Sequence, residues 1–275
     1  MADSKVWFIT GCSKGFGRVW AEAALERGDK VAATARDVST LEPLAEKYGE
    51  SVLTMALDVQ DHDADFAAVQ AAHEKFGRLD IVANNAGYGL FGAVEEVSEA
   101  QARDQIETNL FGALWVTQAA LPIMRGQGSG HIIQVSSIGG VTAFPEVSLY
   151  HASKWGLEAF SQSLSLEVAD FGIKVTLIEP QGFDTDWSGP SGVRAEQLPA
   201  YEAIREARKK QLGARKRGDP AATGAAILKL VDAEKPPLRC FFGATAFAMV
   251  RPDYESRIAG WEEWDWLAKE AHGAE

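Results

Sequence analysis

The feature that most constrains the fold of this 275-residue chain is a regular alternation between short apolar runs and longer segments with helical periodicity. The runs are apolar on both faces, as expected for strands in the interior of a parallel sheet. They cover residues 6–10, 31–35, 52–57, 81–84, 131–136, 175–179 and 239–242. Because helix-length segments separate these runs, we predict a single α/β domain over residues 1–275, with one doubly wound, mostly parallel, seven-stranded sheet.

Helix-boundary patterns between the runs support this prediction. Asp61 stands where an N-cap is expected, and Gly77 ends the helical pattern that follows it. Ser98 and Gln101 have the spacing of a capping box at the start of another helix.

The charge balance limits the partners of the chain. Hydrophobic residues make up 46% of the chain and charged residues 24%, so a sizeable core is available, while the net charge is -12. An acidic surface argues against a nucleic-acid partner, because phosphate backbones require clustered Lys and Arg. The one basic run, residues 205–217, has no interleaved aromatic residues, and we interpret it as a solvated helix face.

Cysteine usage and hydropathy indicate a cytoplasmic protein that does not enter the membrane. Cys12 and Cys240 are far apart and provide no disulfide framework, which favours a reducing compartment. The first residues show no signal-peptide pattern, and no run reaches the ~18 apolar residues of a membrane span. The five histidines lack the spacing of metal ligands, so no metal site is expected.

Two segments depart from the alternation. Residues 183–211, called the lid segment below, mix Gly, Pro and Trp before turning helical and basic. A stretch inserted between core elements is either a substrate lid or an ordinary surface excursion, and the composition leaves both open. The aromatic and acidic tail, residues 261–266, is interpreted as a helix that packs on the surface or at a subunit contact.

Two motifs follow predicted strands. Residues 10–17 (TGCSKGFG) come after the first strand and open a helix, and their glycines would let the backbone turn sharply toward a pyrophosphate at the helix N-terminus. Residues 84–87 (NNAG) end the fourth strand. Ligands of doubly wound sheets bind at the carboxyl ends of strands, so these small and amide residues suit a cofactor.

A third motif combines Ser137, after the fifth strand, with Tyr150 and Lys154. Tyr150 and Lys154 are four residues apart and therefore neighbours on one helix face. An ammonium group held close to a phenol favours the phenolate, so we expect Lys154 to lower the pKa of Tyr150 from its ordinary value of ~10.

Together these motifs resemble the short-chain dehydrogenase/reductase family, whose fold is the Rossmann fold, along nearly the whole chain and most strongly over residues 5–187. The matching features, in order, are residues 10–17, Asp58, residues 84–87, Asn109, Ser137, Tyr150 and Lys154. The amino-acid sequence of residues 9–17 and 84–89 is similar to that of the hydroxysteroid-dehydrogenase-like, ketoreductase branch of the family. The resemblance implies an enzyme that interconverts a ketone and a secondary alcohol by hydride transfer.

The resemblance also implies residue roles. Tyr150 would donate a proton in reduction, Lys154 would hold the nicotinamide ribose, Ser137 would polarise the carbonyl, and Asn109 would support a water in a proton relay. Asp58 would meet the adenine. The implied cofactor-binding residues are Gly11, Ser13, Lys14, Gly15, Phe16, Gly17, Arg36, Asp58, Val59, Asn85, Ala86, Gly87, Tyr150, Lys154, Pro180 and Thr185.

Two cations predict NADP(H) as the cofactor. The second strand ends at Ala35, without the carboxylate that would hold the free ribose hydroxyl of NAD. Arg36 and Lys14 stand instead where the 2′-phosphate of NADP needs positive charge. Asp37 follows, and we expect it to cap the next helix.

The expected substrate pocket is apolar. Leu90, Phe91, Phe144 and Trp187 would line it and favour a hydrophobic or aromatic ketone. One alternative is a reductase of carrier-bound 3-oxoacyl groups. The other is a non-catalytic NADP(H) sensor, and the presence of Ser137, Tyr150 and Lys154 argues against it. Family members commonly pair two helices across a two-fold axis, so we expect a homodimer or homotetramer.

One position departs from the family pattern. Where the family usually has Pro-Gly after the sixth strand, this chain has Pro180 followed by Gln181, and Thr185 keeps its expected distance. Gln181 thus places a side chain where the family prefers none.

Overall fold

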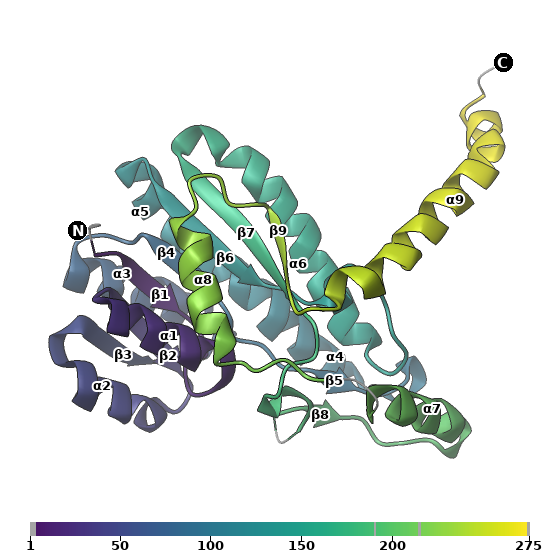
Figure 1. Ribbon diagram of the computed structural model, residues 1–275, viewed down its shortest axis with the longest axis horizontal. Coiled ribbons are helices and arrows are strands. Elements are labelled where there is room, and N and C mark those ends of the chain that lie inside the picture. Colours follow the sequence, from purple (N-terminus) through teal and green to yellow (C-terminus); the bar gives the residue numbers. More distant parts are fainter. Residues whose placement is uncertain (1–3, 190, 214–215, 274–275) are drawn as a thin grey trace.

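The predicted fold is confirmed in the computed structural model, which describes residues 4–189, 191–213 and 216–273 (Figure 1). Seven parallel strands form the main sheet in the order β3-β2-β1-β4-β6-β7-β9. Their bounds are β1 Val6–Ile9, β2 Lys30–Ala35, β3 Val52–Ala56, β4 Ile81–Asn84, β6 Gly130–Val135, β7 Ile173–Pro180 and β9 Arg239–Phe242. Each of the seven predicted runs is one of these strands.

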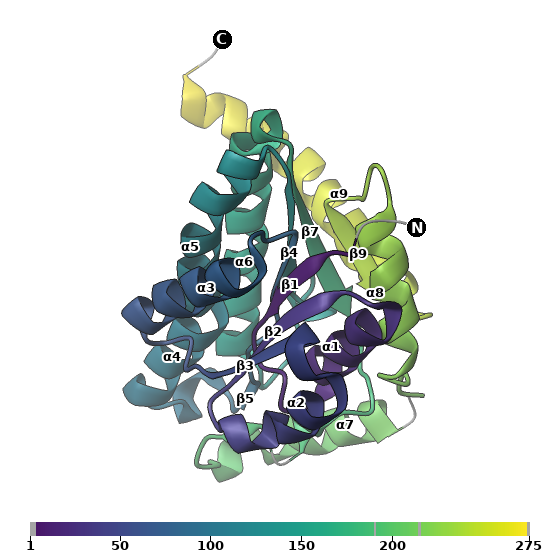
Figure 2. The same cartoon turned by 90° about the vertical axis from the view of Figure 1, so that its left-hand side faces the viewer.

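Helices cover both faces of the sheet. Figure 2 shows α1, α2 and α8 on one side and α3, α5 and α6 on the other. The α-helices are α1 Gly15–Arg27, α2 Glu42–Tyr48, α3 His62–Phe76, α4 Glu99–Ile106, α5 Gly112–Gln127, α6 Ser148–Glu167, α7 Glu202–Gly213, α8 Ala222–Asp232 and α9 Ala246–His272. The expected caps are present: the Asp61 side chain accepts from the Ala64 N–H, and Ser98 and Gln101 form a capping box.

Alternating residues of β1 supply the two halves of the core. Trp7 points to the α1 side, where Trp20 and Ile227 are buried with it. Phe8 points to the other side and packs with residues of α3, α5 and α6. Both faces of the sheet are therefore sealed, which leaves the strand ends as the place where polar groups meet.

A second, two-stranded parallel sheet was not predicted. It pairs β5 (Leu90–Phe91) with β8 (Val193–Arg194), so the lid segment is hydrogen-bonded to the chain that follows β4. The Val193 N–H donates to the Gly89 carbonyl at 2.9 Å. The lid segment also contains the short helix η7 (Asp186–Ser188) and most of α7; its residue 190 lies outside the described residues.

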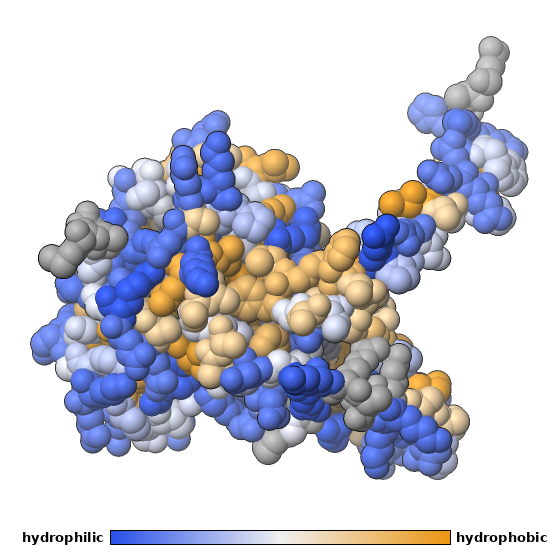
Figure 3. All heavy atoms as spheres, in the orientation of Figure 1, coloured by the Kyte–Doolittle hydropathy of each residue, from blue (hydrophilic) through white to orange (hydrophobic). Residues whose placement is uncertain are grey.

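The last helix, α9, leaves the body of the molecule (Figure 1). Trp261, Trp264 and Trp266 on it are 67%, 55% and 57% exposed. Figure 3 shows hydrophobic side chains gathered where the base of α9 meets the body. Over the described residues, no helix combines the length and apolarity that crossing a membrane requires.

Candidate functional site

The predicted site residues lie mainly around the carboxyl ends of β1, β4, β6 and β7. The sheet order reverses between β1 and β4, because β2 and β3 lie on one side of β1 while the later strands lie on the other. This is the switch point at which doubly wound sheets bind ligands. The β5–β8 pair and α7 lie beyond these strand ends (Figure 1).

Hydrogen bonds join the first two motifs. The Thr10 hydroxyl accepts from the backbone N–H groups of Asn85 and Ala86 at 3.0 and 2.9 Å. In return, the Asn85 amide donates to the carbonyls of Thr10 and Gly11 at 2.8 and 3.0 Å. The side chain of Asn85 therefore fixes the glycine turn and does not point away from the protein.

Glycine is required at two positions of this turn. Gly11 has a φ of 71°, in the left-handed region that disfavours side chains. A Cβ on Gly17 would lie 2.4 Å from the Gly11 carbonyl oxygen. The N-terminus of α1 has no side-chain cap, so its first N–H groups remain available to an anionic ligand.

The third motif lies at the end of β6, where Tyr150 and Lys154 are buried and Ser137 is partly buried. Tyr150 and Lys154 share a face of α6 and are 7% and 5% exposed. Lys154 Nζ donates to the Val135 carbonyl at 2.6 Å and lies 5.9 Å from the centre of the Tyr150 ring. The Ser137 hydroxyl accepts from the Gly139 N–H at 2.9 Å.

The expected lowering of the Tyr150 pKa is not found. Burial raises the pKa of Tyr150 to about 12, against a smaller lowering by the hydrogen bond with Ser137. Burial also lowers the pKa of Lys154 to about 8, although the nearby Glu158 carboxylate raises it. The physical reason is that the Lys154 ammonium is directed to a backbone carbonyl while both groups are removed from water.

Asn109 lies in a π-helical segment, η4 (Glu107–Phe111), between α4 and α5. Its side chain is 1% exposed, accepts from the Tyr88 N–H at 3.1 Å and donates to the Tyr88 carbonyl at 3.0 Å. It also donates to the Ser153 hydroxyl at 3.2 Å. These bonds connect η4 to the chain after β4 and to α6; π-helical turns are frequent at functional sites.

The two cations expected at the cofactor phosphate have different surroundings. Lys14 forms an ion pair of 3.0 Å with Asp186 of the lid segment, and both side chains are about half exposed. Arg36 is exposed at the end of β2, after the buried Ala35. Asp37 caps η1 (Val38–Leu41) by accepting from the Ser39 N–H at 3.1 Å, as expected.

The remaining predicted cofactor residues border the same strand ends. Asp58 follows β3 and accepts from the Gln60 N–H at 3.2 Å. Val59 is buried against Gly112, where a Cβ would come within 2.6 Å of it. Pro180 ends β7, and the Thr185 hydroxyl accepts from the Trp187 N–H at 3.4 Å at the start of η7.

Gln181 turns away from this region. Its side-chain oxygen accepts from the backbone N–H and the hydroxyl of Thr245, at 3.0 and 2.9 Å. Gly243, with a φ of 135°, makes room, because a Cβ there would lie 2.2 Å from the Gln181 side chain. The unusual residue after Pro180 thus holds the loop between β9 and α9.

Three of the four expected pocket residues lie near Tyr150. The Trp187 ring centre is 4.8 Å from that of Tyr150, and the Phe91 ring centre is 5.2 Å from that of Trp187. The Phe144 ring centre is 5.7 Å from that of His151, the residue after Tyr150. Leu90 is different: it is 1% exposed, and its N–H donates to the Gln105 side chain at 2.8 Å, which is the position of a core residue.

The interpretation of residues 205–217 as a solvated face needs correction at two positions. Arg205 is 10% exposed and pairs with the fully buried Glu96 at 2.7 Å. Arg208 is 15% exposed and lies 3.5 Å from Glu146. Both partners come from distant parts of the chain, so the basic run gave no indication of them; residues 214–215 of the run lie outside the described residues.

A buried acidic pair lies below Lys154. Glu158, one helical turn further along α6, and Glu179 of β7 are 5% and 1% exposed. Arg239 of β9 lies 2.8 Å from Glu158 and 3.6 Å from Glu179. Burial and the neighbouring Glu158 raise the pKa of Glu179 to about 8. The spacing of Tyr150, Lys154 and Glu158 places all three on one helix face, so the i, i+4, i+8 pattern in the sequence was a signal for the position of Glu158.

Comparisons with known proteins agree with this geometry. A family model described as short chain dehydrogenase matches residues 5–194. Oxidoreductase BOA17 of Botryotinia fuckeliana (strain B05.10) is 43% identical over 266 residues, 95% of this chain and 97% of that protein. The 3-ketodihydrosphingosine reductase of Bacteroides thetaiotaomicron is 35% identical over 243 residues, 87% of this chain and 88% of that protein. The solved structure of a short-chain dehydrogenase from Streptomyces avermitilis superposes with a TM-score of 0.92 at 38% identity, covering 98% of this chain and 99% of that one.

Proposed function

Because the chain belongs to the short-chain dehydrogenase family, we propose that it is an NADPH-dependent enzyme that reduces a hydrophobic ketone to a secondary alcohol and catalyses the reverse oxidation. Members of the family are oxidoreductases that bind a nicotinamide cofactor, NADP or NAD. The observation that supports the proposal most is the group formed by the buried Tyr150 and Lys154 with the partly buried Ser137, beside Trp187 and the end of β6.

The glycine turn fits a dinucleotide. The close approach of Gly17 to the Gly11 carbonyl excludes side chains there, and the uncapped start of α1 offers N–H groups to a pyrophosphate. Lys154 uses one donor on the Val135 carbonyl, which leaves two N–H groups for the ribose hydroxyls of the cofactor. When bound, the cofactor supplies the hydride that the carbonyl carbon accepts.

The residues at the end of β6 would handle the proton. The Ser137 hydroxyl accepts from the Gly139 N–H, and its own proton, directed to Tyr150 in the free protein, would be donated to a substrate carbonyl oxygen when one binds. Tyr150 donates its phenolic proton to the same oxygen as the carbonyl is reduced. Its raised pKa keeps the phenol protonated near neutral pH, which suits reduction better than oxidation.

Lys14 and Arg36 support the preference for NADPH, since both would place positive charge near a 2′-phosphate and Ala35 offers no carboxylate to a ribose hydroxyl. Phe91, Phe144 and Trp187 support an apolar substrate. The relative named 3-ketodihydrosphingosine reductase is consistent with such a ketone.

We propose that residues 183–211 act as the substrate lid. The supporting contacts are the Lys14–Asp186 ion pair, which ties the lid segment to the glycine turn, and Trp187, which packs beside Tyr150. Assembly as a homodimer or homotetramer in the cytoplasm is likewise a proposal, which the exposed tryptophans of α9 and the free cysteines Cys12 and Cys240 support. Light scattering tests the oligomeric state, and a monomer at micromolar concentration would contradict the proposed assembly.

The main alternative is a reductase of carrier-bound 3-oxoacyl groups. Lys209 and Lys210 are exposed on α7, near the pocket, where an acidic carrier protein would dock. A panel of aryl and alkyl ketones, a small polar ketone and a carrier-linked 3-oxoacyl thioester, followed by NADPH absorbance, distinguishes the alternatives. Turnover of the free hydrophobic ketones with the highest kcat/KM supports the proposal. Preference for the thioester or the polar ketone would contradict it, and no turnover with any substrate would favour a sensor.

A further inference from the structure

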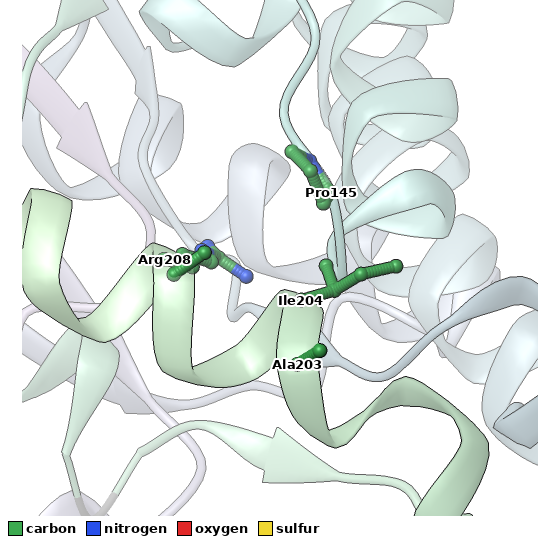
Figure 4. A pocket seen from close by; sticks show the side chains of 5 residues that line it. Pro145, Ala203, Ile204 and Arg208 are labelled. Atoms are coloured by element: carbon green, nitrogen blue, oxygen red, sulfur yellow. The ribbon is translucent and has the colours of Figure 1, made fainter.

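A solvent-open pocket of about 440 Å³ lies between α7 and the loop before α6, and one cation, Arg208, is among its lining residues. The lining residues are Pro145, Ala203, Ile204, Ala207 and Arg208. Figure 4 shows Pro145 on one side and Ala203, Ile204 and Arg208 of α7 on the other. An open pocket whose lining is apolar except for one cation suits the charged end of a ligand that also has a hydrophobic chain.

Arg208 is incompletely neutralised in this position. Its side chain is 15% exposed, and its ion pair with Glu146 is long at 3.5 Å. Burial lowers the pKa of Arg208, the Glu146 carboxylate opposes this effect, and the nearby charge of Arg194 of β8 adds a smaller lowering. The guanidinium of Arg208 has five N–H groups, and its long contact with Glu146 leaves donors for an anion in this partly buried position.

Aromatic rings connect this charge to the reacting centre. The guanidinium carbons of Arg194 and Arg208 lie 4.8 and 5.7 Å from the centre of the Phe91 ring. Phe91 packs edge-on against Trp187, and Trp187 packs against Tyr150. A ligand whose carbonyl lies at Tyr150 could follow these rings to the two arginines.

The partner of Arg208 has an unusual backbone. Glu146 has a φ of 65° and is the one non-glycine residue with positive φ among the residues that the structure describes. Its carbonyl accepts from the Gly92 N–H at 2.8 Å, which fixes the loop to the residue after β5. Residues held in this conformation cost free energy and gather at ligand clamps, where neighbouring structure enforces them.

We infer that Arg208, with Arg194 beside it, binds an anionic group on the substrate, so that the enzyme selects hydrophobic ketones that also bear a carboxylate or phosphate. This inference rests on the proposed ketone reduction and names its substrate class. Glu146 acts in it as a positioning residue: it holds Arg208 in place and competes with the substrate anion for the guanidinium. The alternative is that the Glu146–Arg208 pair only holds α7 against the loop.

A matched pair of ketones separates the two explanations. 9-Oxodecanoate and its methyl ester share one chain and one methyl ketone and differ only at the far end, which is a charged carboxylate in one and a neutral methyl ester in the other. We expect the wild type to have the higher kcat/KM for the carboxylate. Arg208→Gln should reduce the ratio of kcat/KM for carboxylate over ester by at least about tenfold, the size expected for a lost hydrogen bond to a charged group.

Two further variants provide the contrast. Glu146→Gln removes the competing carboxylate and should raise the carboxylate-to-ester ratio. Lys209→Gln removes an exposed charge from the next position of α7 and should change the ratio by less than about twofold at physiological salt, because water and salt screen it. If the ion pair only held α7, Arg208→Gln and Glu146→Gln would affect both ketones equally and leave the ratio unchanged. That result, or a wild-type preference for the ester, would overturn the inference.

A binding measurement tests anion recognition independently of whether the enzyme reduces ketones. The Kd of 9-oxodecanoate is measured by calorimetry on the NADP-loaded wild type and on Arg208→Gln. Weaker binding by the variant supports anion recognition even if neither ketone is reduced, in which case only the proposed reaction fails. Equal Kd values, or no binding to the wild type, would overturn the inference whether or not ketones are reduced.

To decide whether the anion is a phosphate or a carboxylate, decyl phosphate and decanoate are compared as inhibitors of the reduction of the ketone in the methyl ester. Both should inhibit wild type better than Arg208→Gln, and the stronger inhibitor identifies the preferred anion. If neither inhibits, the proposed anion site is contradicted.

Discussion

Lys14 Nζ lies 3.0 Å from Asp186 Oδ2, so a cation of the glycine turn is paired with a carboxylate of the lid segment. The expected ligand of Lys14 is the 2′-phosphate of NADPH, which would have to compete with Asp186 for it. Both side chains are about half exposed, so the pair itself contributes little to stability.

Removing Asp186 should therefore favour NADPH. We expect Asp186→Asn to lower the KM for NADPH by up to about fivefold, the range of an exposed ion pair, and to leave the KM for NADH nearly unchanged. Steady-state kinetics with each cofactor measure both values. An equal rise of both KM values would mean that the pair instead holds the lid segment in position.

The charge of Lys154 should determine the alkaline limb of the reduction rate. Burial lowers the pKa of Lys154 to about 8, so the group is charged below that pH and loses its proton as the pH rises through it. If the ammonium is required, kcat for ketone reduction falls over the same range. Glu158 raises the pKa of Lys154, and we expect Glu158→Gln to move this limb to lower pH. A complete pH profile of kcat measures the shift of this limb. If the limb does not move, the role of Glu158 is contradicted. A loss of folded protein would lower kcat at every pH without shifting the limb.

Cofactor preference should depend on the end of β2. Ala35→Asp combined with Arg36→Leu removes a cation from the 2′-phosphate and adds a repelling carboxylate, so the ratio of kcat/KM for NADPH over NADH should fall by at least about tenfold. Asp37→Asn is the matched control, because Asp37 caps η1 and we expect it to leave the ratio unchanged. If the wild type used both cofactors equally, the NADPH assignment would be wrong.

Gln181 should contribute to stability and not to turnover. Its side-chain oxygen accepts two hydrogen bonds from Thr245 and turns away from the site. We expect Gln181→Gly to lower the free energy of unfolding by about 1–2 kcal/mol and to change kcat/KM by less than about twofold. Chemical denaturation and kinetics on the same preparation test this; a large loss of kcat/KM at unchanged stability would place Gln181 in the reaction.

The strands were predictable because they are apolar on both faces and the helices between them are capped. The β5–β8 pair was not predictable, since two residues per strand give no periodicity and its hydrogen bonds join parts of the chain about a hundred residues apart. The same is true of Arg208, whose buried position depends on Glu146 and Phe91 and not on its basic neighbours.

Sequence spacing located the site but not its electrostatics. The four-residue spacing of Tyr150 and Lys154 does place both on one face of α6. The spacing does not reveal that Lys154 is directed to the Val135 carbonyl, or that burial outweighs charge attraction and raises the pKa of Tyr150. Such effects depend on which groups surround the pair after folding.

The proton transfer assigned to Tyr150 is the central claim, and Tyr150→Phe tests it most directly. The substitution removes only the phenolic oxygen from a buried side chain, so the packing against Trp187 should remain. With a hydrophobic ketone and saturating NADPH, the account predicts that kcat falls by about 10²–10⁴-fold while the Kd for NADPH stays close to that of the wild type. A Tyr150→Phe enzyme that reduces the ketone at the wild-type rate would contradict the account.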